Sequence, residues 1–185
     1  MLPYGPPRQI AFLCRDIEAS MAWHTSRFGT GPWFVMDRIT LTNSTWRGSP
    51  CDIELSAALA GWGDIQIELL QQHDEKPSVY RDWYSRPFTR QVQHHVAYWV
   101  EDYGASIARA ERDGFVVEQE GWLPRGRFAY LVHEDNPEQF LELAESTPAR
   151  RAFNKAIADA AVGWTGDAPR RLFSDAIPVQ EGQAS

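Results

Sequence analysis

Two stretches of the chain repeat the same order of apolar and polar positions, 86 residues apart. In residues 9–16 and again in residues 95–102, a short alternating segment typical of a β-strand leads to an aspartate. Each aspartate suits the N-cap of a helix, and apolar residues with helical spacing follow it. The helical patterns end at Gly29 and at Gly114, because glycine readily ends a helix. The chain therefore contains two units that each begin with a strand and a helix.

Three further strand-like segments follow each predicted helix, so each unit is predicted to be βαβββ. They cover about residues 33–38, 53–60 and 64–70 in the first unit, and about 116–120, 127–133 and 139–144 in the second. The polar and aromatic segment between the two units is predicted to hold a short helix at about 78–84.

The two units and their flanks divide the 185 residues into four parts of one compact domain. The first module covers residues 1–72, a linker 73–92, the second module 93–145, and a C-terminal helix and flexible tail 146–185. The helix is predicted from Thr147 to about Val162, with Pro148 at a favourable early position. From Thr165 onwards, the content of Gly, Pro and Gln predicts loose order.

Strand alternation places four polar side chains on the sheet faces turned away from the predicted helices. Gln9 and His95 lie near the starts of the first strands, while Glu68 and Glu142 lie in the last strands. His94 falls on the helix side or at the strand entrance. Each glutamate alone could be on a solvent-exposed face. If the repeats face each other, however, the four side chains converge, and an imidazole, two carboxylates and an amide oxygen suit a divalent metal ion.

At these positions the chain resembles the vicinal oxygen chelate superfamily, which includes glyoxalase I, methylmalonyl-CoA epimerase, extradiol dioxygenases and bleomycin-resistance proteins. The resemblance covers about residues 8–145. The stretches that carry it are residues 9–12, 15–16, 67–70, 94–97 and 140–143. It implies an α+β fold in which two βαβββ modules form an open, cupped β-sheet, an incomplete barrel, with a C-terminal helix and tail beyond it. It also implies a homodimer.

The resemblance implies that Gln9, Glu68, His95 and Glu142 are the metal ligands, a set similar to that of zinc-type glyoxalase I. It implies Zn²⁺ first, with Ni²⁺, Co²⁺, Mn²⁺, Fe²⁺ and Mg²⁺ as alternatives. Iron extradiol dioxygenases use two histidines and one carboxylate. Since only His95 stands at a ligand position, that chemistry is disfavoured.

The function implied is that of a metal-dependent isomerase, epimerase or lyase of the glyoxalase type. Such an enzyme moves a proton α to a carbonyl of a hydrophobic or aromatic organic substrate through a metal-stabilised enolate. Glu142 is the expected base, with Glu68 as the second candidate. The alternative is a non-catalytic module that binds and sequesters a small molecule, as in drug resistance.

Aromatic residues are abundant, with 8 Trp, 6 Tyr and 9 Phe. Most are expected in the core, but some could line a cavity for an organic ligand. Trp99 and Phe140 share the faces of His95 and Glu142, so we predict that they bind substrate. Trp83 and Tyr84 lie in the linker and could form a lid over it.

The net charge of −7 disfavours a nucleic-acid partner and argues against CoA or nucleotide substrates. Arg125 and Arg127 flank Gly126, where they could bind a substrate carboxylate, although a solvated hairpin is the favoured interpretation. The partner expected is therefore a small molecule of low charge.

No apolar run is long enough to span a membrane, and the N-terminal residues lack the features of a signal peptide. Cys14 and Cys51 are too few for a cysteine-rich zinc site or a disulfide framework. These observations predict a cytoplasmic protein.

Overall fold

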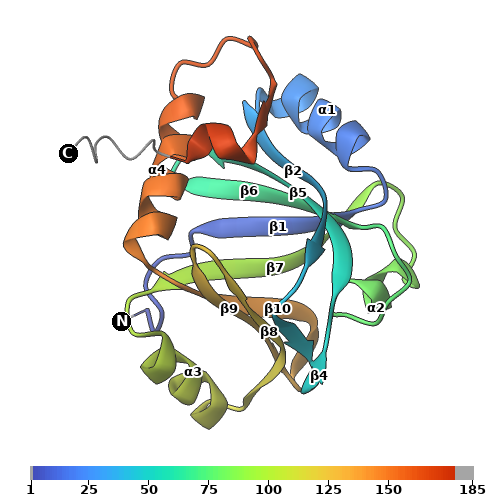
Figure 1. Ribbon diagram of the computed structural model, residues 1–185, viewed down its shortest axis with the longest axis vertical. Helices are drawn as coiled ribbons and strands as arrows, with labels where there is room; N and C mark the ends of the chain where they lie inside the picture. Colours follow the sequence, from blue (N-terminus) through green and yellow to red (C-terminus); the bar gives the residue numbers. More distant parts are fainter. Residues whose placement is uncertain (1, 178–185) are drawn as a thin grey trace, which may run out of the picture.

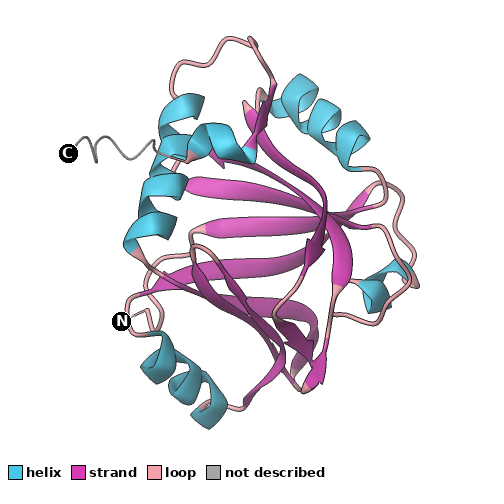
Figure 2. Cartoon of the chain, viewed as in Figure 1, coloured by secondary structure: helices cyan, strands magenta, loops and turns pink. Residues whose placement is uncertain are grey.

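Each half of the chain folds as a strand, a helix and further strands in the computed structural model, which describes residues 2–177 (Figures 1 and 2). The first half contains β1 (Gln9–Cys14), α1 (Ile17–Phe28), β2 (Trp33–Leu41), β3 (Ser44–Trp46), β4 (Ser49–Pro50), β5 (Ile53–Trp62) and β6 (Ile65–Gln72). A linker with α2 (Arg81–Tyr84) leads to β7 (Gln91–Val100), α3 (Tyr103–Arg112), β8 (Phe115–Leu123), β9 (Gly126–His133) and β10 (Asn136–Glu145). The chain then forms α4 (Pro148–Ala161), β11 (Arg170–Leu172) and a 3₁₀ helix (Phe173–Ala176).

The strands form one mixed sheet in which the order β2-β5-β6-β1 in the first half is mirrored by β7-β10-β9-β8 in the second. β1 and β7 are antiparallel neighbours at the centre. Each of them also pairs in parallel with the last strand of its own half, β6 or β10. The predicted α+β fold with an open, cupped sheet is confirmed, and equivalent strands of the two halves meet at the centre of the cup.

The helices begin where the sequence predicts, because aspartate side chains cap them. Asp16 accepts a hydrogen bond from the backbone N–H of Ala19, and Asp102 accepts one from that of Ala105, both at 2.9 Å. Gly29 ends α1 in the left-handed conformation, with φ of 67°. α1 and α3 both pack on the convex side of the sheet, against separate apolar clusters. Neither of these two helices therefore covers the concave side.

The β3–β4 hairpin was not predicted, because its strands are only two and three residues long. β3 pairs with β8 of the second half, whereas β2 pairs with β5 of the first half. Residues 42 and 43 thus connect strands near the two opposite ends of the strand order. This connection requires the sheet to bend into the cup seen in Figure 1.

α4 begins as predicted, with the Thr147 hydroxyl accepting a hydrogen bond from the backbone N–H of Arg150 at 3.1 Å. The helix packs on β5 at Gly61, where an added Cβ would stand 2.9 Å from the Cβ of Ala161. No helix within residues 2–177 is long and apolar enough to cross a membrane.

The expectation of a loosely ordered tail from Thr165 is wrong for residues 170–176. β11 pairs with β2, and Ala176 is buried against Phe153 of α4. These contacts were missed because a three-residue strand leaves little pattern in a sequence. Residues 178–185 lie outside the described part.

Candidate metal centre

Three strands of the cup bring Glu68, His95 and Glu142 together. Ala11 of β1 lies between two of them, since it pairs with Glu68 on β6 and with His95 on β7. Glu142 on β10 pairs with Ala97, which lies two residues beyond His95 on the same face. Because these alanines are small, the longer side chains beside them can converge over the sheet.

The donor atoms of the three residues all lie within 4.8 Å of one another. The His95 Nε2 atom is 2.8 Å from Glu142 Oε2 and 3.3 Å from Glu68 Oε2. It is buried, yet it has no hydrogen bond of acceptable geometry among the described residues. A nitrogen lone pair and two carboxylate oxygens around one point form a donor set suited to Zn²⁺ and similar ions. The residues present therefore fit a divalent cation.

The electrostatics of the cluster also favour a positive charge at its centre. Burial opposes protonation of His95, but the nearby carboxylates, Glu142 first, outweigh it and raise the pKa of the imidazole to about 9. Burial also raises the pKa of Glu68, and the imidazole opposes that shift. Either a proton or a metal cation can supply the missing positive charge.

Gln9 lies on the same concave face and lines the same cavity as Glu68 and Glu142. Its Nε2 donates to Oε1 of Gln66 at 2.6 Å. The Gln9 amide oxygen is thus the atom that remains for a cation. Gln66 is a further cavity residue, and it lies on the face of Glu68 because the two residues are two positions apart on β6.

His94 lies inside the cup, which corrects the expected position on the helix side or at the strand entrance. Ala11 pairs with His95 and Phe12 pairs with Gln93, so His94 is an extra residue in β7. Such a bulge breaks the two-residue alternation on which the expectation depended. Both neighbouring imidazoles therefore reach the concave side.

The hydrogen bonds of His94 determine which nitrogen of His95 is free. His94 Nε2 lies 3.2 Å from the carbonyl oxygen of Val79, which can only accept, so this nitrogen carries the proton. Burial holds the pKa of His94 well below its usual range, and the neutral ring then accepts at Nδ1. His95 Nδ1, at 3.1 Å, must donate to it. The lone pair of neutral His95 is therefore on Nε2, facing the two carboxylates.

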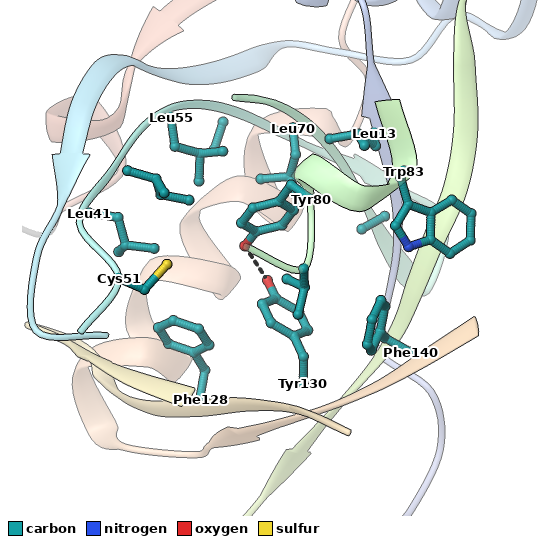
Figure 3. Close-up of a cluster of buried hydrophobic side chains, with 14 residues drawn as sticks. Leu13, Leu41, Cys51, Leu55, Leu70, Tyr80, Trp83, Phe128, Tyr130 and Phe140 are labelled. Carbon is teal, nitrogen blue, oxygen red and sulfur yellow. Dashed lines mark hydrogen bonds between the residues drawn. The ribbon is translucent and has the colours of Figure 1, made fainter. Parts of the chain in front are cut away.

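The aromatic residues predicted to bind substrate occupy different places. Trp99 lines the cavity with Glu68 and Glu142. Trp83 and Phe140 pack against the His94 ring instead, with ring centroids 5.5 and 4.9 Å away, and lie beside each other in Figure 3. The Tyr84 hydroxyl donates to the carbonyl oxygen of Cys14 at 2.9 Å. Trp83 and Phe140 thus contact His94, Tyr84 ties the linker to β1, and none of the three is among the described residues that line the cavity with Glu68 and Glu142.

Tyr80 and Tyr130 form a buried pair at the cavity wall, with their hydroxyl oxygens 3.0 Å apart (Figure 3). Tyr130 pairs with Glu142 across β9 and β10, and its ring centroid lies 4.9 Å from that of His95. Directly paired residues of neighbouring strands lie on the same face, so Tyr130 lies on the concave face with Glu142.

Two arginines, Arg125 and Arg150, also line the cavity. The sequence suggested a ligand-binding role only for Arg125, as the alternative to a solvated hairpin. Arg125 stacks on Phe153 of α4, with its guanidinium carbon 4.1 Å from the ring centroid. Arg127 turns outward and pairs with Glu145 at 3.1 Å. The overall charge of −7 is therefore not the charge of the cavity.

Comparison with known proteins gives both a family and a fold. Residues 8–130 match the family described as the Glyoxalase/Bleomycin resistance protein/Dioxygenase superfamily. The methylmalonyl-CoA epimerase from Mycobacterium tuberculosis is 20% identical, with a TM-score of 0.55 over 79% of this chain and 91% of that chain. No curated protein matches the chain.

Two further solved structures are similar to this chain. A variant of Streptomyces coelicolor methylmalonyl-CoA epimerase in complex with 2-nitronate-propionyl-CoA is 17% identical, with a TM-score of 0.53 over 77% of this chain and 95% of that chain. A hypothetical protein from Bacillus halodurans C-125 is 14% identical, with a TM-score of 0.56 over 77% and 94%. At these identities the similarity is one of fold.

Proposed function

The chain belongs to the Glyoxalase/Bleomycin resistance protein/Dioxygenase superfamily, and from this premise we propose that it is a divalent-metal-dependent enzyme that moves a proton next to a carbonyl group. The reaction is an isomerisation, an epimerisation or an elimination. The observation that carries the proposal is the buried cluster of Glu68, His95 and Glu142, whose donor atoms lie within 4.8 Å of one another.

Glu68, His95 and Glu142 would hold the ion, with the amide oxygen of Gln9 as a fourth ligand. We propose Zn²⁺, with Ni²⁺, Co²⁺, Mn²⁺, Fe²⁺ and Mg²⁺ as alternatives to be compared in the same assay. A divalent cation bound there supplies Lewis-acid polarisation of a carbonyl oxygen, which makes the neighbouring C–H group more acidic.

A carboxylate of the cluster would take the proton. The C–H bond breaks, its electron pair delocalises towards the carbonyl oxygen, and the new carboxyl group later returns the proton to the same or an adjacent carbon. We propose Glu142 for this role and Glu68 as the second candidate. Burial raises the pKa of Glu68, which suits a base that works near neutral pH.

Apolar side chains support the proposal of a hydrophobic substrate. They form much of the cavity wall and come from both halves of the cup: Met36, Leu41, Leu55, Leu59, Leu123 and Phe128. Trp99 adds an aromatic surface near the polar centre. The body of the substrate would contact this wall, while its carbonyl group faces the cluster.

Exchange of the α-proton tests this function without knowledge of the product. The Zn²⁺-loaded protein is incubated in D₂O with 2-oxo acids, 2-hydroxy ketones and methylmalonyl-CoA, and loss of the α-proton signal is followed by NMR. Methylmalonyl-CoA is included because similar structures are named for it. We expect exchange with at least one class, at a rate that Glu142→Gln lowers by about 10³-fold. Absence of stoichiometric metal, or exchange that Glu142→Gln leaves unchanged, contradicts the proposal. Ligand binding without exchange would instead indicate the sequestering module.

A homodimer remains part of the proposal, by analogy with the family. The three strongest donors all come from a single chain. The cluster therefore does not need a second copy, and light scattering after size-exclusion chromatography tests the association separately from metal binding.

A further inference from the structure

The cavity beside the metal centre contains two guanidinium groups that the proposed proton transfer does not use. Arg125 precedes β9 and Arg150 lies in the first turn of α4, and both line the cavity together with Glu68 and Glu142. α4 lies outside residues 8–130, the region that matches the family. In Figure 1 it runs across the strands of the first half rather than along them. Arg150 is thus a feature of this chain's own C-terminal helix.

Neither guanidinium forms an ion pair with a carboxylate of residues 2–177. Arg150 donates from one terminal nitrogen to the carbonyl oxygens of Gly126 and Arg127, at 3.3 and 3.2 Å. Its Nε atom is buried and has no hydrogen-bond partner in the same region. Burial, and then the nearby Arg150, lower the pKa of Arg125 to about 10. The two groups therefore have unused donors in a partly desolvated place.

The charge balance of the cavity changes when a metal ion is bound. Without metal, the carboxylates of Glu68 and Glu142 face the two guanidinium groups and the His95 imidazole, whose pKa the carboxylates raise. With a divalent cation on the carboxylates and a neutral His95, the two guanidinium charges are in excess. A metal-loaded cavity therefore favours an anionic ligand.

We propose that Arg125 and Arg150 bind a carboxylate group of the substrate, so that the enzyme acts on hydrophobic organic acids. This inference rests on the proposed function and adds the substrate class to it. The substrate would place its carbonyl group at the metal centre, its acid group at the arginines and its body against the apolar wall. The face of Arg125 is covered by the Phe153 ring at 4.1 Å, so its planar edge is the part that reaches a ligand. A planar edge with parallel N–H donors matches the two oxygens of a carboxylate.

The positions of both arginines are fixed by the surrounding chain. The Thr147 hydroxyl donates to the carbonyl oxygen of Arg125 at 2.6 Å and caps the helix that carries Arg150. Phe153 packs with Phe34 and Leu59 of the sheet, which fixes α4 on the cup. A preorganised pair of this kind binds without an additional ordering cost.

Calorimetry with matched probes tests this assignment. The probes are 3-phenylpropionate, its neutral amide 3-phenylpropanamide, and 2-phenylethylphosphonate, each titrated into Zn²⁺-loaded and Zn²⁺-free protein. The variants are Arg125→Gln and Arg150→Gln, with Arg125→Lys and Arg150→Lys as milder versions if the first pair folds poorly. Arg127→Gln is the matched control, because this arginine of the same hairpin points outward to Glu145.

We expect the native protein to bind the acid about tenfold or more tightly than the amide, and each glutamine variant to lose most of that ratio. The lysine variants should retain part of it, and Arg127→Gln all of it, with Zn²⁺ stoichiometry unchanged throughout. A native ratio near one, an unchanged ratio in the variants, or tighter binding of the phosphonate than of the acid would overturn the assignment. Because the ratio is also measured without Zn²⁺, failure of metal binding would contradict only the proposed function.

Discussion

The two halves of the cup have the same strand order but contribute differently to the metal centre. The second half supplies His95 and Glu142, whose side-chain atoms lie 2.8 Å apart. The first half supplies Glu68, whose carboxylate lies 3.3 Å from the same imidazole nitrogen. The repeat therefore determines which positions face one another, while local packing determines how closely they approach.

The concave side is also covered differently in the two halves. α4 packs on the first half through Phe153 and Ile157. In the second half, the linker residues Tyr80 and Trp83 pack against the ring of His94. The comparison shows that repeated segments supply the candidate ligands, whereas segments without a counterpart shape the cavity around them.

Replacing each of the two glutamates by glutamine gives the largest expected effect on the rate of catalysis. Glu142→Gln should lower the rate of α-proton exchange by about 10³-fold, because removing a general base typically costs 10²- to 10⁴-fold. Glu68→Gln should cost about tenfold less, since it weakens the metal site but leaves the base. NMR exchange rates at saturating Zn²⁺ measure both, and metal content is checked by mass spectrometry. A larger loss for Glu68→Gln would assign the base to the first half instead.

Substitution of His94 tests whether a residue that contacts His95 affects metal affinity. His94→Phe keeps a ring beside Trp83 and Phe140 but removes the acceptor that fixes the His95 tautomer. Metal affinity should fall by about 10- to 100-fold, as it does when groups that orient a ligating histidine are lost. Competition with a zinc chelator measures the affinity, and His24→Phe, at a buried histidine on α1, is the control. Equal affinity of native protein and His94→Phe would show that His94 only packs.

The difference between repeated and unrepeated segments also explains what the sequence could predict. Glu68, His95 and Glu142 were predicted together because each strand has a period of two and the units repeat. His94 was misplaced because one extra residue in β7 shifts that period, and nothing in a single strand's sequence reveals which residue pairs with which.

The cavity lining was less predictable, because it combines residues from distant segments. Arg150 lies on a helix whose position depends on packing at Gly61, and no periodicity in α4 indicates which strand it covers. The net charge could not reveal a local pair of arginines, since it sums over the whole surface. The sequence places Trp83 in the linker and Phe140 on the face of Glu142, but only the structure shows that both contact the His94 ring.

Packing of α4 on the first half can be disturbed at a single backbone position. Gly61→Ala places a Cβ 2.9 Å from Ala161 Cβ and 3.4 Å from Ala158 Cα, so the helix must shift. Overpacking of this kind should lower the free energy of unfolding by about 1–3 kcal/mol. Gly104→Ala on α3 is the control, because the added Cβ would come no closer than 3.8 Å to an Asp102 carboxylate oxygen, and alanine favours a helix. Urea denaturation measures both, and an unchanged midpoint for Gly61→Ala would mean that α4 is loosely docked.

The smallest expected effect concerns His24, which stands on α1 at the position that Ala110 occupies on α3. Burial lowers the pKa of His24 from 6.5, and a hydrogen bond from Gln91 opposes this only in part. The folded state therefore prefers the neutral ring, while the unfolded chain takes up a proton below about pH 6.5. Stability from this group is complete above that pH and is lost as the pH falls. A single proton limits the slope to about 1.4 kcal/mol per pH unit.

His24→Phe should remove this contribution, so the urea midpoint of the native protein should fall relative to that of the variant as the pH is lowered from 8 to 5. Parallel midpoints across that range would mean that the α1 histidine does not titrate differently in the folded and unfolded chain.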